Sequence, residues 1–136
     1  MLQVSEILNL SLFNNFELIA GKKGLKNELK NVVILEYESI NNHYEVFSEG
    51  DFVLTSLFFA KDDPSLIEAA FRKLFTKKVC AIAVKTVFFK DIPNKLKILA
   101  DSLNIPLFVF NNSYMEDLII CVNELLKSKQ QYLAFE

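Results

Sequence analysis

Side chains able to bind or react follow four apolar runs of the sequence, each at the point where the run ends. They are an acid, two hydroxyls, a base and two amides: Glu36, Thr55, Ser56, Lys85, Asn111 and Asn112. In an open parallel sheet, ligands bind outside the carboxyl ends of the strands. If the four runs are parallel strands, their ends predict a small-molecule site at one edge of the sheet. The alternative is that Glu36 pairs with Lys85, or that both cap helices, with no ligand at all.

The same residues include a nucleophile and a base. A Thr55 or Ser56 hydroxyl beside the Lys85 amine would suit a small-metabolite hydrolase or transferase. The sequence has no GxSxG, P-loop, HExxH or GxGxxG motif. Glu36 and Glu38 alternate along a run and so would face opposite sides of a sheet, which argues against a two-acid site. We therefore predict a non-enzymatic protein with no catalytic residue and no cofactor.

The histidine and the cysteines indicate no metal site. His43 lies in a polar segment and is interpreted as a solvated loop residue. Cys80 lies in a strand-like run and Cys121 in a helix-like run, with no CxxC spacing between them. We expect both to be buried, reduced thiols that act as small apolar side chains.

Short apolar runs alternate with amphipathic stretches, which is typical of strand-helix-strand units. From residue 51 the pattern predicts, in order, a strand at 51–55, a helix after Asp63-Pro64, a strand at 79–84, a helix capped by Asp91 and ended by Asn104, a strand at 107–110, and a helix opened by a capping box from Ser113 to Glu116. Before it we expect a short helix at 4–10 and strands at 17–20 and 31–37. The predicted fold class is α/β, a mostly parallel sheet with flanking helices, βαβαβα from residue 51, with a less regular N-terminal third.

Length and composition limit the possible domain organisation of the chain. The chain has 136 residues, of which 51% are hydrophobic and 24% charged, so disordered and collagen-like classes are excluded. We expect one domain over residues 1–127, with 128–136 as a helical tail or linker toward a C-terminal region that is missing here. No run is long enough to span a membrane and the first residues do not resemble a signal peptide, so the prediction is a cytoplasmic protein.

Charge is distributed unevenly along the chain. The formal net charge is −2, negative in the first half and positive in the second, where most of the cations lie between residues 72 and 97. We interpret these cations as residues of helix faces and last turns, where they suit the helix dipole. The balance predicts no direct DNA binding by this segment.

A set of short motifs occurs in order along the chain. Residues 20–25 read AGKKGL, Glu36 closes the next apolar run, and residues 49–56 read EGDFVLTS. Further on come a D-D-P helix start, an AIAVK strand ending in Lys85, and LNIPL at residues 103–107. This ordered set resembles the N-terminal domain of PucR-like (purine catabolism regulatory protein-like) bacterial transcription regulators.

The resemblance implies a domain that senses a small molecule or relays a signal, while DNA binding belongs to a helix-turn-helix near the C-terminus of a longer chain. It implies a role in purine catabolism, but the sequence leaves the effector open. The motif glycines are Gly21, Gly24 and Gly50, and we expect them to shape turns between strands. One departure concerns the position after the LTT-like triplet, where the family pattern has glycine and this chain has Leu57.

Three apolar groups could form a self-complementary surface. They are Leu57, Phe58 and Phe59, then Phe88 and Phe89, and finally Tyr132, Leu133 and Phe135. Because regulators of palindromic DNA act as symmetric dimers, we predict a homodimer. The competing interpretation is that the loops fold down as a lid over the sheet edge. A pure dimerisation module is the remaining alternative function.

Overall fold

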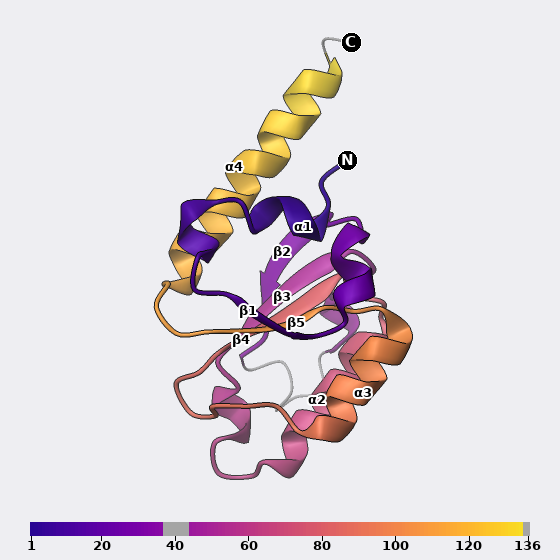
Figure 1. Ribbon diagram of the computed structural model, residues 1–136, viewed down its shortest axis with the longest axis vertical. Helices are drawn as coiled ribbons and strands as arrows, with labels where there is room; N and C mark the ends of the chain where they lie inside the picture. Colours follow the sequence, from indigo (N-terminus) through magenta and orange to yellow (C-terminus); the bar gives the residue numbers. More distant parts are fainter. Residues whose placement is uncertain (37–43, 135–136) are drawn as a thin grey trace.

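The computed structural model describes residues 1–36 and 44–134, which form a five-stranded sheet between two helical layers (Figure 1). The strands are β1 (Glu17–Ala20), β2 (Asn31–Ile34), β3 (Asp51–Thr55), β4 (Ala81–Lys85) and β5 (Leu107–Phe110). Their order across the sheet is β1-β5-β4-β3-β2. Strands β2 to β5 are mutually parallel, and β1 pairs antiparallel with β5. The predicted fold class is confirmed, and β1, β3 and β5 have their predicted bounds, whereas β4 begins two residues later and ends one residue later than predicted.

The α-helices of the described residues are α1 (Val4–Ile7), α2 (Ser65–Thr76), α3 (Asn94–Leu103) and α4 (Met115–Ala134). From residue 51 onward, helices alternate with strands. The described residues also form four short 3-10 segments: η1 (Ser11–Phe13), η2 (Lys22–Lys26), η3 (Tyr44–Val46) and η4 (Phe58–Ala60). The second strand is shorter than predicted and ends at Ile34, while Tyr37, Glu38 and His43 lie outside the described residues.

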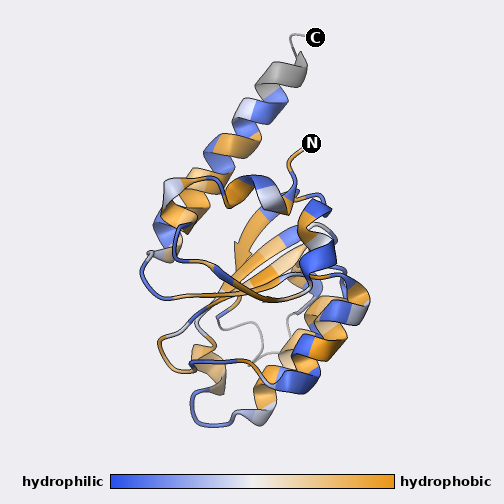
Figure 2. Ribbon diagram, in the orientation of Figure 1, coloured by the Kyte–Doolittle hydropathy of each residue, from blue (hydrophilic) through white to orange (hydrophobic). Residues whose placement is uncertain are grey.

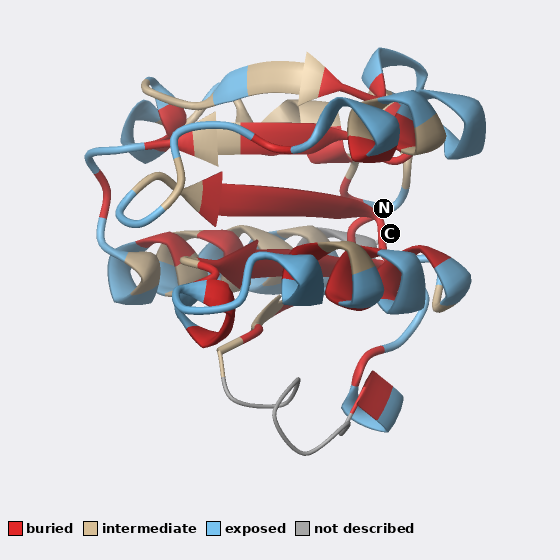
Figure 3. Ribbon diagram, turned by 90° about the horizontal axis from the view of Figure 1, so that it is seen from below, coloured by how far each residue is buried: buried red, intermediate tan, exposed pale blue. Residues whose placement is uncertain are grey.

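Side chains alternate between two cores, one on each face of the sheet. In β4, Ile82 and Val84 join the core under α2 and α3, whereas Ala81 and Ala83 join the core under α1 and α4. A strand covered on both faces has no polar face, which explains its uninterrupted apolar sequence. Figure 2 shows the apolar strands, and Figure 3 shows that the central strands are buried while the edge strands are partly exposed.

Helix ends follow the sequence only in part. The Asp63 carboxylate accepts hydrogen bonds from the Ser65 N–H and hydroxyl at 3.2 and 2.6 Å, so it caps α2 as predicted. Asp91 does not cap α3, which begins at Asn94 after Pro93, and it pairs instead with Lys97 at 2.9 Å. The capping box from Ser113 is also wrong, because the Ser113 hydroxyl donates to the Leu12 carbonyl at 2.6 Å.

Helix α4 packs its first turns on the sheet and then continues past it (Figure 1). Leu118 and Val122 are fully buried against the strands. Farther along, Lys129 forms an ion pair with Glu6 of α1 at 2.7 Å, which ties the projecting part of the helix to the N-terminal segment. In the described part of the chain, no helix combines the length and apolarity needed to cross a membrane.

Asp51 is a buried carboxylate at the start of β3, and burial raises its pKa. A pKa above the unfolded value of about 3.9 means that the folded state favours the protonated form. This contribution to stability is therefore present at low pH and is lost as the pH rises through the folded-state pKa. We expect Asp51→Asn to be more stable than the parent at pH 7, because an amide oxygen can still accept the Ser48 N–H that the carboxylate accepts at 2.8 Å.

The measurement is urea denaturation of parent and Asp51→Asn between pH 4 and pH 7. The advantage of the variant should shrink as the pH falls. An advantage that stays constant over this range would show that Asp51 does not titrate as its burial requires. Asp62→Asn, at an exposed aspartate, is the control and should change stability little at any pH.

Candidate functional site

The carboxyl edge of the sheet brings two of the predicted site residues together. The Ser56 N–H donates to Glu36 Oε1 at 2.9 Å, and the Ser56 hydroxyl lies 3.0 Å from Oε2. Within residues 1–36 and 44–134, no ion pair joins Glu36 to Lys85. The Lys85 ammonium instead lies over the Tyr114 ring, 5.1 Å from its centroid. The predicted alternative of a Glu36–Lys85 pair is therefore wrong.

Thr55 is not available to a ligand. Its side chain is fully buried, and its hydroxyl accepts the Leu57 N–H at 3.0 Å. Among the hydrogen bonds of the described residues, none joins Lys85 to Thr55 or Ser56. In the described part of the chain, the Lys85 amine is thus not hydrogen-bonded to either candidate nucleophile, Thr55 or Ser56.

Asn111 and Asn112 meet a residue that the sequence analysis missed. Their backbone N–H groups donate to Asn15 Oδ1 at 3.0 and 3.1 Å, and Asn15 Nδ2 donates to the Ser113 hydroxyl at 3.2 Å. The Asn15 side chain therefore fixes the end of β5 to the loop before β1. Beside it lies a hollow of about 300 Å³ that Asn112 and Tyr114 help to line. An asparagine in a polar loop gives no signal of this role in the sequence.

The order of the strands bears on whether the carboxyl edge carries the ligand-binding crevice typical of parallel sheets. Helices α2 and α3 cover the same face, and β2 to β5 follow one another across the sheet in chain order. The crevices of open α/β sheets form where the strand order reverses, and these four strands have no such reversal. Leu57, Phe59 and Ala60 fold into the core, as the lid interpretation predicts. Phe58 and Phe88 stay 42% and 40% exposed and pack edge to face, with ring centroids 5.6 Å apart.

Leu57 stands where the family pattern has glycine, and its backbone explains that preference. Its φ is +60°, in the left-handed region that glycine adopts without strain. The side chain is fully buried, so leucine fills core space that glycine would leave empty. Compared with glycine, leucine at this position therefore strains the backbone but improves the packing of the core.

The motif glycines lie at the opposite, amino edge of the sheet. Gly21 has φ +75°, and a Cβ there would lie 2.0 Å from the Ile105 carbonyl oxygen. A Cβ on Gly24 would lie 2.0 Å from the Asn104 carbonyl oxygen. The turn after β1 thus packs backbone to backbone against the loop before β5. Gly50 has φ +85° and carries the Lys30 side chain across it, so all three glycines shape turns as expected.

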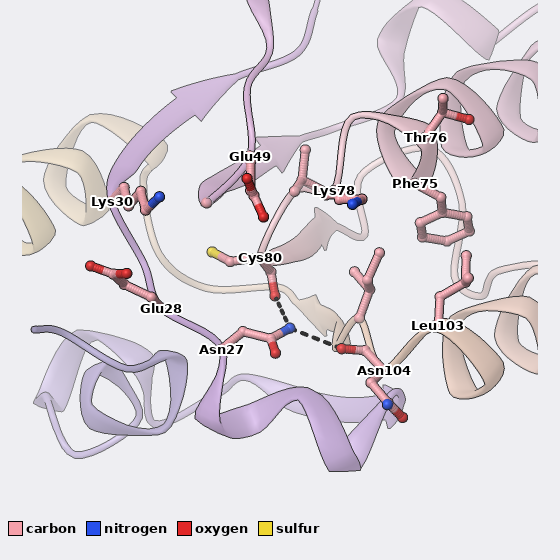
Figure 4. Close-up of a pocket in the computed structure, with 13 residues that line it drawn as sticks. Asn27, Glu28, Lys30, Glu49, Phe75, Thr76, Lys78, Cys80, Leu103 and Asn104 are labelled. Carbon is pink, nitrogen blue, oxygen red and sulfur yellow. Dashed lines mark hydrogen bonds between the residues drawn. The ribbon is translucent and has the colours of Figure 1, made fainter.

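A pocket of about 580 Å³ opens at this amino edge (Figure 4). Its walls come from the segments that lead into β2, β3, β4 and β5, and from the last turns of α2 and α3. Asn27 holds two of these segments together, because its Nδ2 donates to the Asn104 carbonyl at 2.8 Å and to the Cys80 carbonyl at 3.2 Å. Neither this pocket nor the smaller hollow is lined by Glu36, Thr55, Ser56 or Lys85.

Cys80 lies at this pocket but is not a reactive thiol. Burial and the nearby Asp51 carboxylate raise its pKa far above the ordinary range, so the thiolate does not form near neutral pH. Both cysteines are free, as predicted. Only Cys80 is buried, and Cys121 is half-buried, because α4 turns its side chain toward the margin of the core.

Comparison with known proteins gives a consistent result. A model of the purine catabolism regulatory protein-like family, PucR, matches residues 6–125. The purine catabolism regulatory protein of Bacillus subtilis (strain 168) is 24% identical over 107 residues, which is 78% of this chain and 20% of that protein. The chain thus spans about a fifth of the length of this curated relative.

A solved structure shares the fold. It contains the CBS and DRTGG domains of the regulatory region of Clostridium perfringens pyrophosphatase, complexed with the activator diadenosine tetraphosphate. The TM-score is 0.56 at 18% identity, over 87% of this chain and 48% of that one. The family match begins within α1, ends within α4 and includes all five strands, as the resemblance seen in the sequence predicted. This chain therefore belongs to the purine catabolism regulatory protein-like family.

Proposed function

We propose that this chain is a cytoplasmic, non-enzymatic domain that senses a small-molecule effector, or relays its signal, in a bacterial transcription regulator. The observation that carries the proposal is the family match over residues 6–125, which includes nearly every element of the fold. DNA binding would then belong to a helix-turn-helix in a different part of a longer protein.

Two further observations support a sensing role. The solved structure with this fold belongs to a regulatory region in complex with a nucleotide activator. Helix α4 is anchored in the core by Leu118 and continues past the sheet to Ala134, so its outer turns are placed to pass a change in the domain to whatever follows (Figure 1). Among residues 1–36 and 44–134, Lys85 is not hydrogen-bonded to Thr55 or Ser56, so this pair gives the enzymatic alternative no support.

The sensing role predicts that an effector stabilises the chain. We expect at least one of hypoxanthine, xanthine, urate, allantoin and diadenosine tetraphosphate to raise the melting temperature. A ligand at about 100 times its Kd adds roughly 2.7 kcal/mol of stability, which is a rise of several degrees for a domain of this size. Thermal unfolding followed by fluorescence or circular dichroism measures it. A panel in which no compound raises the melting temperature would contradict sensing of these metabolites.

We also propose that the regulator is a homodimer and that the exposed Phe58–Phe88 pair contributes to the interface. The Lys61 ammonium lies 5.6 Å from the centroid of the Phe58 ring, so a basic group borders this aromatic surface. The side chains of Tyr132 and Leu133, and Phe135, lie outside the part of the chain that the structure describes.

Sedimentation equilibrium at micromolar concentration tests the dimer. We expect a dimer for the parent and a weaker one for Phe88→Ser, because this change removes apolar area from an exposed aromatic patch. Ile98→Ser, at an exposed apolar residue of α3, is the matched control and should leave association unchanged. A parent that sediments as a 15.6 kDa monomer would contradict the proposal.

A further inference from the structure

The polar carboxyl edge is where ligands of parallel sheets usually bind, but the larger of the two hollows described above lies at the other edge. We propose that the amino-edge pocket is the effector site, and that it takes a small metabolite carrying an anionic group, N–H donors and an apolar face. This inference rests on the proposed sensing function and names its site and ligand class.

The size of the pocket fits such a ligand. Its volume is about 580 Å³, within the range of roughly 300 to 1,000 Å³ typical of small-molecule sites. Four different segments of the chain contribute to it, and Asn27 hydrogen-bonds two of them. The close backbone contact at Gly24 and Asn104 holds the same region rigid. The walls are therefore preformed, which lowers the entropic cost of binding.

One wall is apolar. Phe75 and Ile105 are buried beneath it, and Leu103 stands above them with 46% of its surface exposed. In Figure 4 the Phe75 ring and the Leu103 side chain lie side by side on one flank of the pocket. A flat or apolar part of a ligand would cover Leu103 and remove this area from water.

The opposite rim carries four charges of both signs. Lys30, Lys78, Glu28 and Glu49 are exposed, and among the described residues none of them takes part in an ion pair or a side-chain hydrogen bond. By contrast, the Glu68 carboxylate on α2 is paired with both Arg72 and Lys95.

The mixture of charges defines the class of ligand. An ammonium favours an anionic group on the ligand, and a carboxylate favours N–H donors, through charge-assisted hydrogen bonds. A ligand with negative charge alone would meet the two glutamates unfavourably. A ligand with positive charge alone would meet the two lysines in the same way.

The backbone conformation of Lys78 is one that favours glycine over lysine. Helix α2 ends in a Schellman motif, in which the Lys78 N–H donates to the Phe75 carbonyl at 3.0 Å and the Val79 N–H to the Leu74 carbonyl at 3.4 Å. Lys78 occupies the left-handed position of this motif with φ +60°, where glycine is preferred. Helix α3 ends in the same way at Asn104, whose residue type tolerates this conformation. A lysine held in strain at the pocket rim is consistent with a functional use of its side chain.

The test uses this strain. Lys78→Gly should keep or raise the melting temperature of the unliganded chain, because glycine relieves the left-handed backbone. The same change should weaken ligand binding at least tenfold, because the ammonium is lost. Unfolding cannot explain a variant that is at least as stable as the parent but binds more weakly.

Glu49→Gln is the second variant and should also weaken binding. Lys73→Ala removes the same charge from α2 outside the pocket and should leave Kd within twofold.

The probes separate ligand classes, and NMR titration of the 15N-labelled 136-residue chain locates the site. Urate and L-citrulline combine an anionic group with N–H donors, whereas glutarate is anionic only. We expect a compound of the first kind to shift the amide signals of Gly50, Lys78, Cys80 and Asn104. Glutarate binding as tightly as the best of these would overturn the ligand class.

The outcomes also separate this inference from the proposed function. Shifts at Ser56 and Lys85, with binding weakened by Lys85→Ala and not by Lys78→Gly, would overturn the amino-edge site while sensing stands at the carboxyl edge that the sequence predicted. An absence of saturable shifts with every probe would overturn both. Shifts at the amino edge with a tenfold effect of Lys78→Gly support both.

Discussion

Gly24→Ala should lower the free energy of unfolding by about 3 kcal/mol, at the upper end of the usual cost of overpacking. The added methyl group would lie 2.0 Å from the Asn104 carbonyl oxygen and 2.6 Å from Pro106 Cδ. Neither neighbour can rotate away, because one is backbone and the other is a proline ring. The turn after β1 must therefore separate from the loop before β5, which also strains the Asn27–Asn104 hydrogen bond.

Urea denaturation measures this loss, and Lys23→Ala is the matched control. Lys23 lies in the same turn but is exposed, so its replacement should change stability by less than about 0.5 kcal/mol. Equal stabilities of the two variants would show that the close backbone contact is absent. A ligand that binds at the amino edge should also lose affinity for Gly24→Ala, because this contact builds the pocket wall.

Phe110→Ala should cost about 3 to 5 kcal/mol, the usual range for removing a buried aromatic ring. Phe110 is 2% exposed at the end of β5, and its ring stacks on Phe16 with centroids 4.5 Å apart. Phe16 in turn contacts Phe13 of η1, with centroids 4.6 Å apart. The substitution would therefore leave a cavity where the N-terminal segment, β5 and α4 meet.

The control for this prediction is the same substitution at an exposed ring. Phe88→Ala removes a ring that is 40% exposed and should cost about 1 kcal/mol or less. Chemical denaturation of both variants, followed by far-UV circular dichroism, gives the comparison. A loss at Phe110 no larger than the loss at Phe88 would contradict the packing described here.

Local sequence signals predicted the elements well where local chemistry decides them. The runs ELIA and DFVLT are short, apolar and bounded by turn residues, and they became β1 and β3 without a change of bounds. Asn104 before a proline two residues later predicted the left-handed end of α3, and its φ is +56°. Residues that depend on distant partners were predicted less well. The Ser113 hydroxyl bonds to Leu12, about a hundred positions away, and this contact replaces the expected capping box.

At the candidate site too, local features were predicted and contacts between distant segments were not. The sequence placed Glu36 and Ser56 at one edge, and they do form hydrogen bonds there. It could not show that the parallel strands follow one another without a reversal, so that they lack the switch point at which such sheets usually bind ligands. Lys30, Glu49 and Lys78 are ordinary surface residues in separate segments, and only the folded chain brings them to one pocket.

The antiparallel pairing of β1 with β5 has a consequence for the order of folding during synthesis. Glu17 lies opposite Val109, so β1 leaves the ribosome long before its partner exists. At about 5–20 residues per second, the roughly 90 residues between them take on the order of 5–20 s. Throughout this interval the parallel strands β2 to β4 can associate, while β1 and the N-terminal aromatic residues remain without their final neighbours. During synthesis this apolar segment must avoid aggregation and wrong pairing. The sheet is complete only when its first strand, β1, pairs with its last strand, β5.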